Sequence, residues 1–378
     1  MALSKILNAS VTNSTLTTTK LATPNLGRRN VLINGGMNVS QRNGTTLTAT
    51  ANNSLFLDRW KCYLNGPSSI STQQMLPLDS NVTALNTASG ENYNNIMYID
   101  CTTASAIQSS DLLGVIQLIE GSNSVPLAGQ SCTLSFWVKS SVTGQYYVTF
   151  KIASARSYIA PYTISSANTW EKKTITITMD TLASLNTNGD TGNGAGFQVY
   201  FGLRLGSSAQ ATSTVNQWVD GNFYGTLSQV TWGTNVSDTF YIGAVQLELG
   251  TAASPFEHRS FGEELALCQR YYYHTYSYGS PAGTTFNQDY ESPIIIIGTG
   301  NHGMGVCNAV YPVEMRVAPT ISFYGSDGTA NRIRHWGGSL AAYGTVNRST
   351  RQILGMSFNA GTDPEDFYSA ALVCDAEL

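Results

Sequence analysis

Short runs in which apolar and polar residues alternate follow one another along most of the chain, and they predict β-strands. The run Lys173–Met179 (KTITITM) alternates strictly with period two, which is typical of a strand that buries one face. Thr-Gly, Asn-Gly and Asp-Gly turns separate the runs. The strands predicted before residue 260 are Leu55–Leu64, Ile96–Cys101, Leu112–Ile119, Cys132–Lys139, Gln145–Ile152, Lys173–Met179, Phe197–Leu205 and Phe240–Leu249.

This pattern predicts an all-β protein in which residues 31–260 form one antiparallel jelly-roll or β-sandwich domain. Strands do not alternate with helices, which excludes a Rossmann fold and a TIM barrel. The residue types agree with the pattern, because Thr favours strands while Gly, Asn and Ser favour turns. The chain also has 20 Tyr, 13 Phe and 6 Trp, enough large rings to fill the core of a sandwich.

One helix is predicted at residues 261–274, where it links the first domain to a second one. Ser260 and Glu263 have the S-x-x-E spacing of a capping box. Leu265, Cys268 and Tyr272 recur at helical spacing, so that one face of the helix can pack. Strands return at Ile294–Ile297, Met304–Tyr311, Thr320–Tyr324, Ile353–Phe358 and Tyr368–Cys374, which predicts a smaller C-terminal β-sandwich over residues 275–378.

Residues 1–30 form a separate segment whose leucines follow neither a helical nor a strand period. Threonine-rich runs are poor helix formers, and this segment cannot bury its apolar residues alone. Two interpretations remain open. The segment is a loose terminus, or it is an extended arm ordered by identical chains or by a larger particle; we favour the arm.

Charge is scarce, and this changes the list of possible partners. Of 378 residues only 12% are charged, about half the usual share of roughly 25%. Lys and Arg number 20 against 24 Asp and Glu, so the net charge of −4 gives no footprint for nucleic acid. The sequence has no apolar run of about 18 residues and no signal-peptide core at its start. We expect no nucleic-acid partner, no membrane insertion and no secretion by a signal peptide.

Cysteine and histidine spacing predicts neither a metal site nor a redox site. Cys62, Cys101 and Cys132 lie in strands predicted for the first domain, and Cys268 lies in the predicted helix. Cys307 and Cys374 lie in strands predicted for the second domain. No two cysteines lie within four residues of each other, so zinc-ribbon and CxxC motifs are absent. We predict small buried thiols rather than disulfides. The histidines, equally isolated in sequence, are His258, His274, His302 and His335.

Catalytic motifs are also absent, including the G-x-S-x-G, H-E-x-x-H and P-loop patterns. Glycoside hydrolysis needs two carboxylates on either side of the sugar bond. Asp58, Glu248 and Glu257 are the candidates, because they lie in or beside predicted core strands. For Asp58 we favour a buried ion pair with Arg59 beside the indole of Trp60. We therefore predict no catalytic residue and no enzyme activity.

Two loops have a faint likeness to calcium sites, but neither has the usual set of acidic ligands. Asn186–Gly194 has one carboxylate, Asp190, and is interpreted as a glycine-rich loop. Thr362–Asp366 (TDPED) is interpreted as an exposed turn. We predict no metal ligand and no cofactor.

Aromatic residues in loop-rich regions are the candidates for binding. Sugar rings stack on aromatic faces, while uncharged polar groups bond the hydroxyls without the cost of desolvating a charge. Most of these rings are nevertheless expected to be core residues. The candidate glycan- or receptor-binding residues are Trp218, Tyr224 and Trp232 in the first domain and Tyr324, Arg334, His335, Trp336 and Tyr343 in the second.

Several motifs resemble those of bacteriophage and prophage tail-fibre proteins, in the same order along the chain. The tract Phe261–Tyr272 (FGEELALCQRYY) is the most specific of them. The segment before residue 30 is similar to the Thr/Lys/Leu repeats at the virion end of such fibres. The other matching segments are Val31–Arg42 (VLINGGMNVSQR), Leu57–Trp60 (LDRW), Leu134–Lys139 (LSFWVK), Ala244–Gly250 (AVQLELG), Ser254–Arg259 (SPFEHR), Pro312–Thr320 (PVEMRVAPT) and Asp375–Leu378 (DAEL).

The resemblance implies a virion protein made in the host cytoplasm, with a jelly roll similar to carbohydrate-binding modules and a distal C-terminal β domain. It implies no hydrolysis. Residues 1–30 would attach to a tail or capsid protein, identical chains would form a homotrimer, and the loops would contact a glycan on the host surface. The shared motifs look like packing residues, so they predict the fold better than they predict a binding site.

Three functions stay open at this stage. The favoured one is a tail fibre that mediates host attachment without catalysis. A head fibre, capsid decoration or tail adaptor is the second possibility. A polysaccharide depolymerase is the third, although the chain has neither the rungs of a β-helix nor a defensible carboxylate pair.

Overall fold

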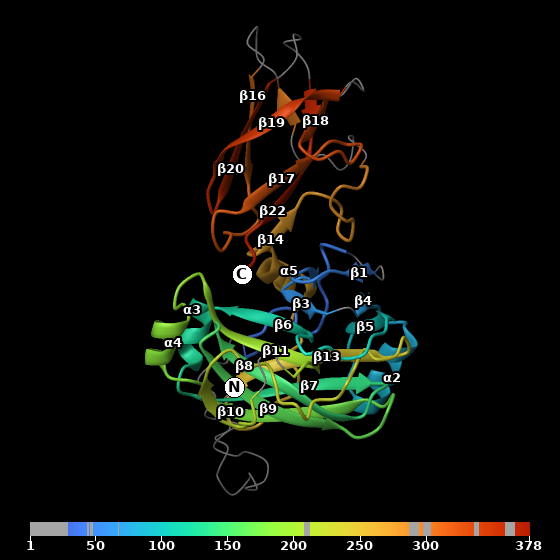
Figure 1. The fold of residues 1–378 in the computed structure, drawn as a ribbon. Coiled ribbons are helices and arrows are strands. Elements are labelled where there is room, and N and C mark those ends of the chain that lie inside the picture. Colours follow the sequence, from blue (N-terminus) through green and yellow to red (C-terminus); the bar gives the residue numbers. More distant parts are fainter. Residues whose placement is uncertain are drawn as a thin grey trace, which may run out of the picture.

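A computed structural model describes residues 29–43, 45, 48–66, 68–207, 212–286, 295–297, 304–335, 340–359 and 367–378. Two β-rich bodies lie end to end in Figure 1, with helix α5 (Phe261–Gln269) between them. The larger body is a sandwich of two antiparallel sheets, and the smaller one stands on one side of it. The predicted all-β class and its β-sandwich are confirmed.

The sandwich consists of a six-stranded sheet, here sheet A, and a seven-stranded sheet, sheet B. In spatial order, sheet A contains β1 (Thr48–Thr50), β4 (Ser69–Met75), β5 (Ile96–Thr103), β13 (Thr239–Leu249), β7 (Ser131–Ser140) and β10 (Glu171–Thr178). Sheet B contains β12 (Trp218–Asp220), β9 (Arg156–Ile164), β8 (Gly144–Ile152), β11 (Ala195–Leu205), β6 (Leu112–Glu120), β3 (Trp60–Asn65) and β2 (Leu55–Leu57).

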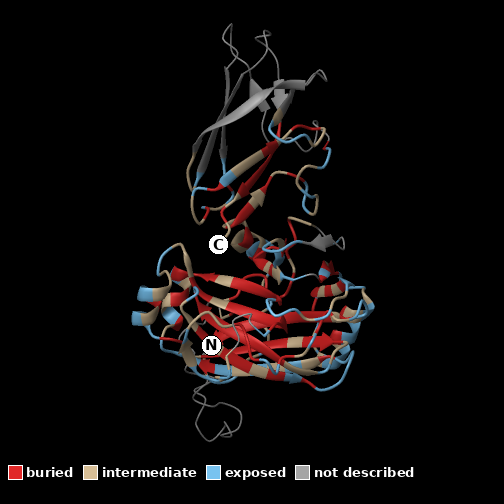
Figure 2. Cartoon of the chain, viewed as in Figure 1, coloured by how far each residue is buried: buried red, intermediate tan, exposed pale blue. Residues whose placement is uncertain are grey.

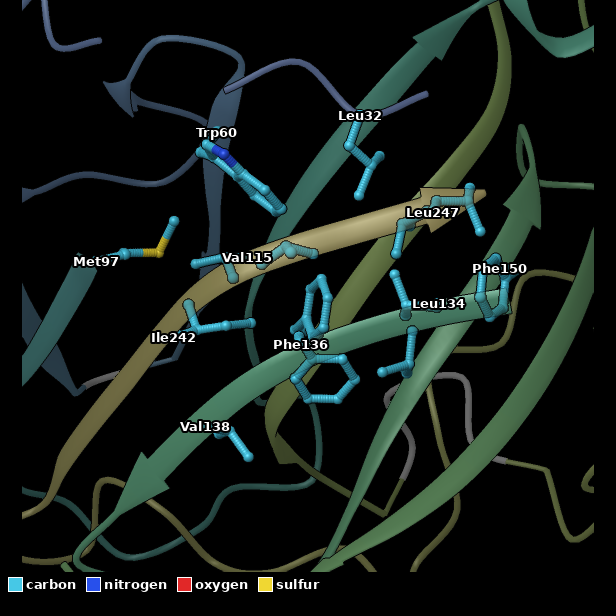
Figure 3. Packing of buried hydrophobic residues seen from close by; sticks show 14 of the residues in the cluster. Leu32, Trp60, Met97, Val115, Leu134, Phe136, Val138, Phe150, Ile242 and Leu247 are labelled. Carbon is cyan, nitrogen blue, oxygen red and sulfur yellow. The ribbon is translucent and has the colours of Figure 1, made fainter. Parts of the chain in front are cut away.

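Alternate residues of both sheets meet in one hydrophobic core, as period-two alternation requires. The rings of Phe136 on β7 and Phe201 on β11 meet edge to face, with their centroids 5.1 Å apart. Figure 3 shows Leu134, Phe136 and Val138 along one strand, facing residues of the neighbouring elements. Figure 2 shows that burial is concentrated along the sandwich strands, while exposure is highest in their connections.

Helices interrupt the sandwich where only strands were predicted, and this is a correction to the sequence analysis. Helix α2 (Ser80–Ser89) starts at Asp79, whose carboxylate accepts a hydrogen bond from the Asn81 amide. Its buried Val82 and Leu85 pack on the outer side of sheet A. The other helical segments are α3 (Gly121–Ser124), the 3₁₀ turn η2 (Val125–Leu127) and α4 (Leu182–Asn188).

The linker helix has the predicted capping box, because Ser260 and Glu263 exchange both hydrogen bonds. It ends at Gln269, five residues before the predicted end. The prediction was wrong for Tyr272–His274, which forms strand β14. That segment pairs with β22 (Ala371–Asp375), and the pairing overrides the helical spacing of the local sequence.

The described part of the C-terminal body contains two further sheets. Sheet C is three-stranded, in the order β14, β22 and β17 (Thr320–Tyr324). Sheet D contains β15 (Ile295–Ile297), β21 (Phe367–Ser369), β18 (Arg332–His335), β19 (Leu340–Ser349), β20 (Ile353–Asn359) and β16 (Met304–Val310). Four of the five strands predicted past the linker are present as single strands, whereas the predicted Tyr368–Cys374 is divided into β21 and β22, which belong to different sheets. Strands β18 and β19 were not predicted.

Several of the motifs that resemble those of tail fibres come together where the two bodies meet. Asn34 lies at φ 57°, and its side chain accepts from the Val39 amide and donates to the carbonyls of Val39 and Asp58. Its own amide donates to Glu264 of helix α5, and its carbonyl accepts from the Trp60 indole at 3.0 Å. The motif residues therefore build a joint, and the prediction that they are packing residues agrees with this placement.

Charged pairs close the same joint across the chain. Arg59 pairs with Glu377, and its guanidinium lies 3.6 Å from the centre of the Tyr271 ring. Glu120 accepts from Arg270 and from the Tyr271 hydroxyl, the latter at 2.7 Å. The Arg270 and Tyr271 donors hold the pKa of Glu120 below its ordinary value, although burial acts in the opposite direction.

Five of the six cysteines are described with their side chains, and all five are buried free thiols. Burial raises the pKa of Cys62, Cys132 and Cys374 to about 12, so these thiols stay protonated at neutral pH. The interpretation as small buried thiols is confirmed for Cys62, Cys101, Cys132, Cys268 and Cys374; the side chain of Cys307 lies outside the described residues.

Candidate functional site

The predicted aromatic residues of the sandwich do not form one exposed surface. Trp232 is fully buried in the sandwich core, so its assignment as a glycan contact is wrong. Tyr224 keeps only 6% of its surface exposed. Trp218 on β12 is half-buried, packs near Phe197 and Tyr158, and donates its indole N–H to a backbone carbonyl.

The predicted residues of the C-terminal body are only partly described. Tyr324 ends β17 and is half-buried, with its ring 6.3 Å from that of Tyr276. The other four predictions lie outside what can be described: Arg334 and His335 belong to β18 and Tyr343 to β19 without described side chains, and Trp336 lies outside the described residues altogether.

Tyr224 instead organises a loop, residues 221–229, that covers the outer face of sheet B. Its ring stacks on Tyr63 at 5.6 Å and meets Tyr200 edge-on at 5.0 Å. The ammonium of Lys151 lies 3.5 Å from the centre of the Tyr224 ring and donates to the Asn222 side chain. This ring cluster seals the middle of the face, so that only its margin is open.

A groove of about 450 Å³ lies at that margin, beside strand β8. Gln145 and Tyr147 are the strand residues that line it, and the loops contribute the other walls. The Tyr147 hydroxyl shares a hydrogen bond with the Thr226 hydroxyl, at 2.5 Å. We call this the loop groove; its other lining residues are Ser207, Thr212, Ser213, Val215, Leu227 and Ser228.

The lining of the loop groove contains hydroxyls, one amide and apolar groups, but no charged side chain. The side-chain amide of Gln145 makes no hydrogen bond within the described part of the chain, so its donors and its acceptor are available to a ligand. Leu227 is 66% exposed and gives the rim an apolar contact surface. Such a surface suits an uncharged, hydroxylated ligand.

A buried arginine fixes the loops that lead to this groove. Arg204, at the end of β11, donates to Asp111 and to the carbonyls of Ser105, Ala106 and Gly233. Both partners of the ion pair are almost fully buried. Sequence reasoning missed this network, since Arg204 lies about a hundred residues from the loop that it holds.

The groove also depends on close backbone packing. A Cβ at Gly225 would lie 2.8 Å from the Gln229 side-chain oxygen, and one at Gly202 would lie 3.0 Å from its nitrogen. These two glycines let the buried Gln229 side chain fit between β11 and the loop.

The three carboxylates weighed for catalysis have structural partners. Asp58 accepts from the backbone and side chain of Gln41, both at 2.6 Å, and not from Arg59, which corrects the predicted ion pair. Glu248 accepts from the side chains of Gln246 and Ser254. Glu257 accepts from backbone amides and from a neighbouring guanidinium. Their oxygens hold the backbone together at the joint and along β13.

Within the described ranges, no group of three or more His, Cys, Asp or Glu side chains is arranged to hold a metal ion. Asp190 accepts from the Gly192 and Gly194 amides, which closes its loop locally. Thr362–Asp366 lies outside the described residues. No helix in the described part of the chain is both long enough and apolar enough for a membrane span.

Lys151 makes the stability of the sandwich depend on pH. Burial lowers the pKa of Lys151 to about 7, against about 10.4 in an unfolded chain. Between these values the unfolded chain binds the extra proton, so the free energy of unfolding rises with pH, by about 1.4 kcal/mol per unit from this group. The destabilisation caused by the buried Lys151 ammonium is greatest below pH 7 and disappears near pH 10.

Lys151→Met should therefore flatten the pH dependence of stability. We expect the variant to gain on the native chain as the pH falls from about 9 to about 6.5, measured as the urea-unfolding free energy of each. Lys172→Met, at an exposed position, is the matched control and should follow the native curve. Parallel curves for Lys151→Met and the native chain would contradict the low pKa.

Several solved structures align with a little more than half of this chain, at low sequence identity. The enzymatically active domain of bacteriophage CBA120 tailspike protein 4 aligns with 14% identity and a TM-score of 0.29, over 58% of this chain and 21% of that one. TmCBM61 with β-1,4-galactotriose aligns with 11% identity and a TM-score of 0.28, over 59% and 100%. The family 11 carbohydrate-binding module of Clostridium thermocellum, with a mixed-linked tetrasaccharide, aligns with 12% identity and a TM-score of 0.27, over 57% and 99%.

The chain thus spans about a fifth of that tailspike chain and essentially all of the two modules. No family model matches the sequence, and no curated protein sequence matches it.

Proposed function

We propose that this chain is a non-catalytic carbohydrate-binding protein whose sandwich holds a neutral saccharide in the loop groove. The uncharged lining of that groove is the observation that carries the proposal. Saccharide hydroxyls exchange hydrogen bonds with Ser, Thr and Gln groups, and the CH faces of the sugar ring pack on Val215 and Leu227. Binding in this form requires no group to lose a charge or a proton.

The absence of catalysis belongs to the same proposal. Asp58, Glu248 and Glu257 are engaged by backbone and side-chain donors, which supports a structural role for each. Mass spectrometry of a host polysaccharide incubated with the protein tests this directly. New reducing ends would establish a depolymerase instead.

The proposed biological setting is a virion, with the chain acting as a tail fibre that attaches to a host-surface polysaccharide. The support is the ordered series of motifs that resembles tail-fibre proteins, including the most specific one at Phe261–Tyr272. We further propose a homotrimer that joins the tail or capsid through residues 1–30. Cryo-electron microscopy of the particle tests both, since a head-fibre or adaptor position would replace the tail assignment.

Removing the Gln145 amide should weaken saccharide binding without unfolding the sandwich. Gln145→Ala removes a side chain that lines the groove and supports no hydrogen bond within the described residues. We expect affinity for the best neutral oligosaccharide on a glycan array to fall about 5- to 15-fold, the worth of one or two hydrogen bonds. Isothermal titration measures the affinity, and thermal unfolding should stay unchanged.

Gln108→Ala is the matched control, because Gln108 is an exposed glutamine of the same domain outside the groove. It should bind like the native chain. Equal affinities for all three proteins would remove the loop groove from the proposal.

A further inference from the structure

A second cavity, here the junction cleft, lies on the face of sheet C where the C-terminal body meets the sandwich. Its volume of about 580 Å³ falls in the range of small-molecule pockets, roughly 300–1,000 Å³. Tyr272, Asp375 and Thr320 are directly opposite one another on β14, β22 and β17. Val373 and Ser322 form the next row on the same face, two residues further along. The floor is therefore a regular strand surface that carries the hydroxyls of Tyr272, Thr320 and Ser322 and the carboxylate of Asp375.

Two arginines, Arg42 and Arg316, line the cleft. Arg42 comes from the loop before the sandwich, and its guanidinium lies 3.6 Å from the centre of the Tyr272 ring. It pairs with Asp375 at 3.0 Å and with Glu377 at 3.3 Å. Two acids hold this arginine in place, and its buried Nε donor has no partner among the described residues.

Arg316 is held differently, because only backbone carbonyls accept its bonds. Its Nε donates to Ala376 at 2.7 Å, and its two Nη atoms donate to Asn193 at 2.6 Å and to Glu377 at 2.9 Å. No carboxylate lies within ion-pair distance of it in the described part of the chain. Three of the five guanidinium N–H groups are used, which leaves two for a ligand.

The two arginines and two acids of the lining balance in number, but they are unevenly paired, because Asp375 and Glu377 both contact Arg42. Arg42 contacts both acids, whereas Arg316 has no carboxylate within ion-pair distance among the described residues, and Glu120 and Asp190 act on it only from further away. Burial lowers the pKa of Arg316, so desolvation of its charge is a real cost that an anionic ligand would offset. Thr320, Ser322 and Asp375 add groups that bond hydroxyls, and Val317 and Ala318 add apolar surface.

We propose that the junction cleft binds an acidic sugar residue, with its carboxylate at Arg316 and its hydroxyls at Thr320, Ser322 and Asp375. Arginine suits this task because its planar donors match a carboxylate in pairs. The site is separate from the loop groove and shares no residue with it. It rests on the proposed function and extends it from neutral saccharides to an acidic saccharide, which binds where the two bodies meet.

The test uses the full chain and three probes: D-glucuronate, D-glucose and acetate. Titration calorimetry should show glucuronate binding at least about tenfold more tightly than either of the others, with the affinity falling as ionic strength rises from about 0.1 M to about 1 M. Glucose lacks the carboxylate and acetate lacks the hydroxyls. Equal binding of glucose, or of acetate, would overturn the assignment of an acidic sugar.

Thr320→Trp tests the location, because Thr320 is exposed on the edge strand and an indole there would occupy space in the cleft while leaving both arginines in the chain. We expect at least a tenfold loss of glucuronate affinity with an unchanged unfolding temperature. Thr285→Trp, at an exposed threonine outside the cleft lining, is the matched control and should bind like the native chain. Unchanged binding by Thr320→Trp would place the ligand elsewhere and overturn the inference.

Gln145→Ala separates this inference from the proposed function. Glucuronate binding should be unaffected by that substitution, since the loop groove is a different cavity. Loss of glucuronate binding in Gln145→Ala alone would move the acidic sugar to the groove, which overturns the junction cleft and leaves the proposed function standing. Glucuronate binding without any neutral-saccharide binding would overturn the proposed function and leave the junction cleft standing.

Discussion

Replacing Arg204 by methionine should destabilise the sandwich by about 3–5 kcal/mol. The substitution leaves Asp111 buried with none of the guanidinium bonds that it now accepts, at 2.8 Å for Nε. It also frees the carbonyls of Ser105 and Ala106 on one loop and of Gly233 on another. Urea unfolding followed by tryptophan fluorescence measures the loss.

The double variant Arg204→Met with Asp111→Leu should regain part of that stability, because it leaves no charge unpaired. Asp220→Ala is the surface control. The Asp220 side chain is 88% exposed in its pair with Arg156, so its loss should cost less than about 1 kcal/mol. A loss for Arg204→Met no larger than that of Asp220→Ala would show that the buried pair does not hold the loops.

Trp60→Ala should cost a similar amount, about 3–5 kcal/mol, by leaving a cavity in the sandwich core. The side chain has no exposed surface, and its ring centre lies 6.1 Å from that of Phe201. Its indole N–H donates to the Asn34 carbonyl at 3.0 Å, so the substitution also loosens the joint. Thermal and urea unfolding both report the change.

Trp218→Ala is the matched control, since this half-buried tryptophan belongs to the edge strand β12. The free energy of unfolding should fall clearly less in Trp218→Ala than in Trp60→Ala. Equal losses in the two variants would mean that burial in the core does not set the contribution of Trp60.

The strands with strong alternation were predictable from sequence, but those with few apolar residues were not. Ser69–Met75 (SISTQQM) forms β4 although five of its seven residues are polar, because it pairs with β5 along its length. Helix α2 was missed for a related reason. Its Ser, Thr and Asn residues are poor helix formers, and its packing on sheet A through Val82 and Leu85 decides the structure.

The candidate binding residues were harder to predict than the strands, because the residue type does not determine whether a side chain is exposed. Trp232 and Tyr224 stand in loop-rich sequence, yet the loops fold back and bury them. The groove lining comes from Gln145 on a strand and from loop residues some seventy positions later. Each is a common uncharged residue, and only the fold brings them together.

The joint has a mechanical consequence for the connection between the two bodies. Arg42 lies just before the sandwich and Asp375 at the close of the last strand, 333 positions apart, yet the two are bonded directly. A pull applied between these two points would load the ion pairs of Arg42 with Asp375 and Glu377 before it loads the strands of the sandwich.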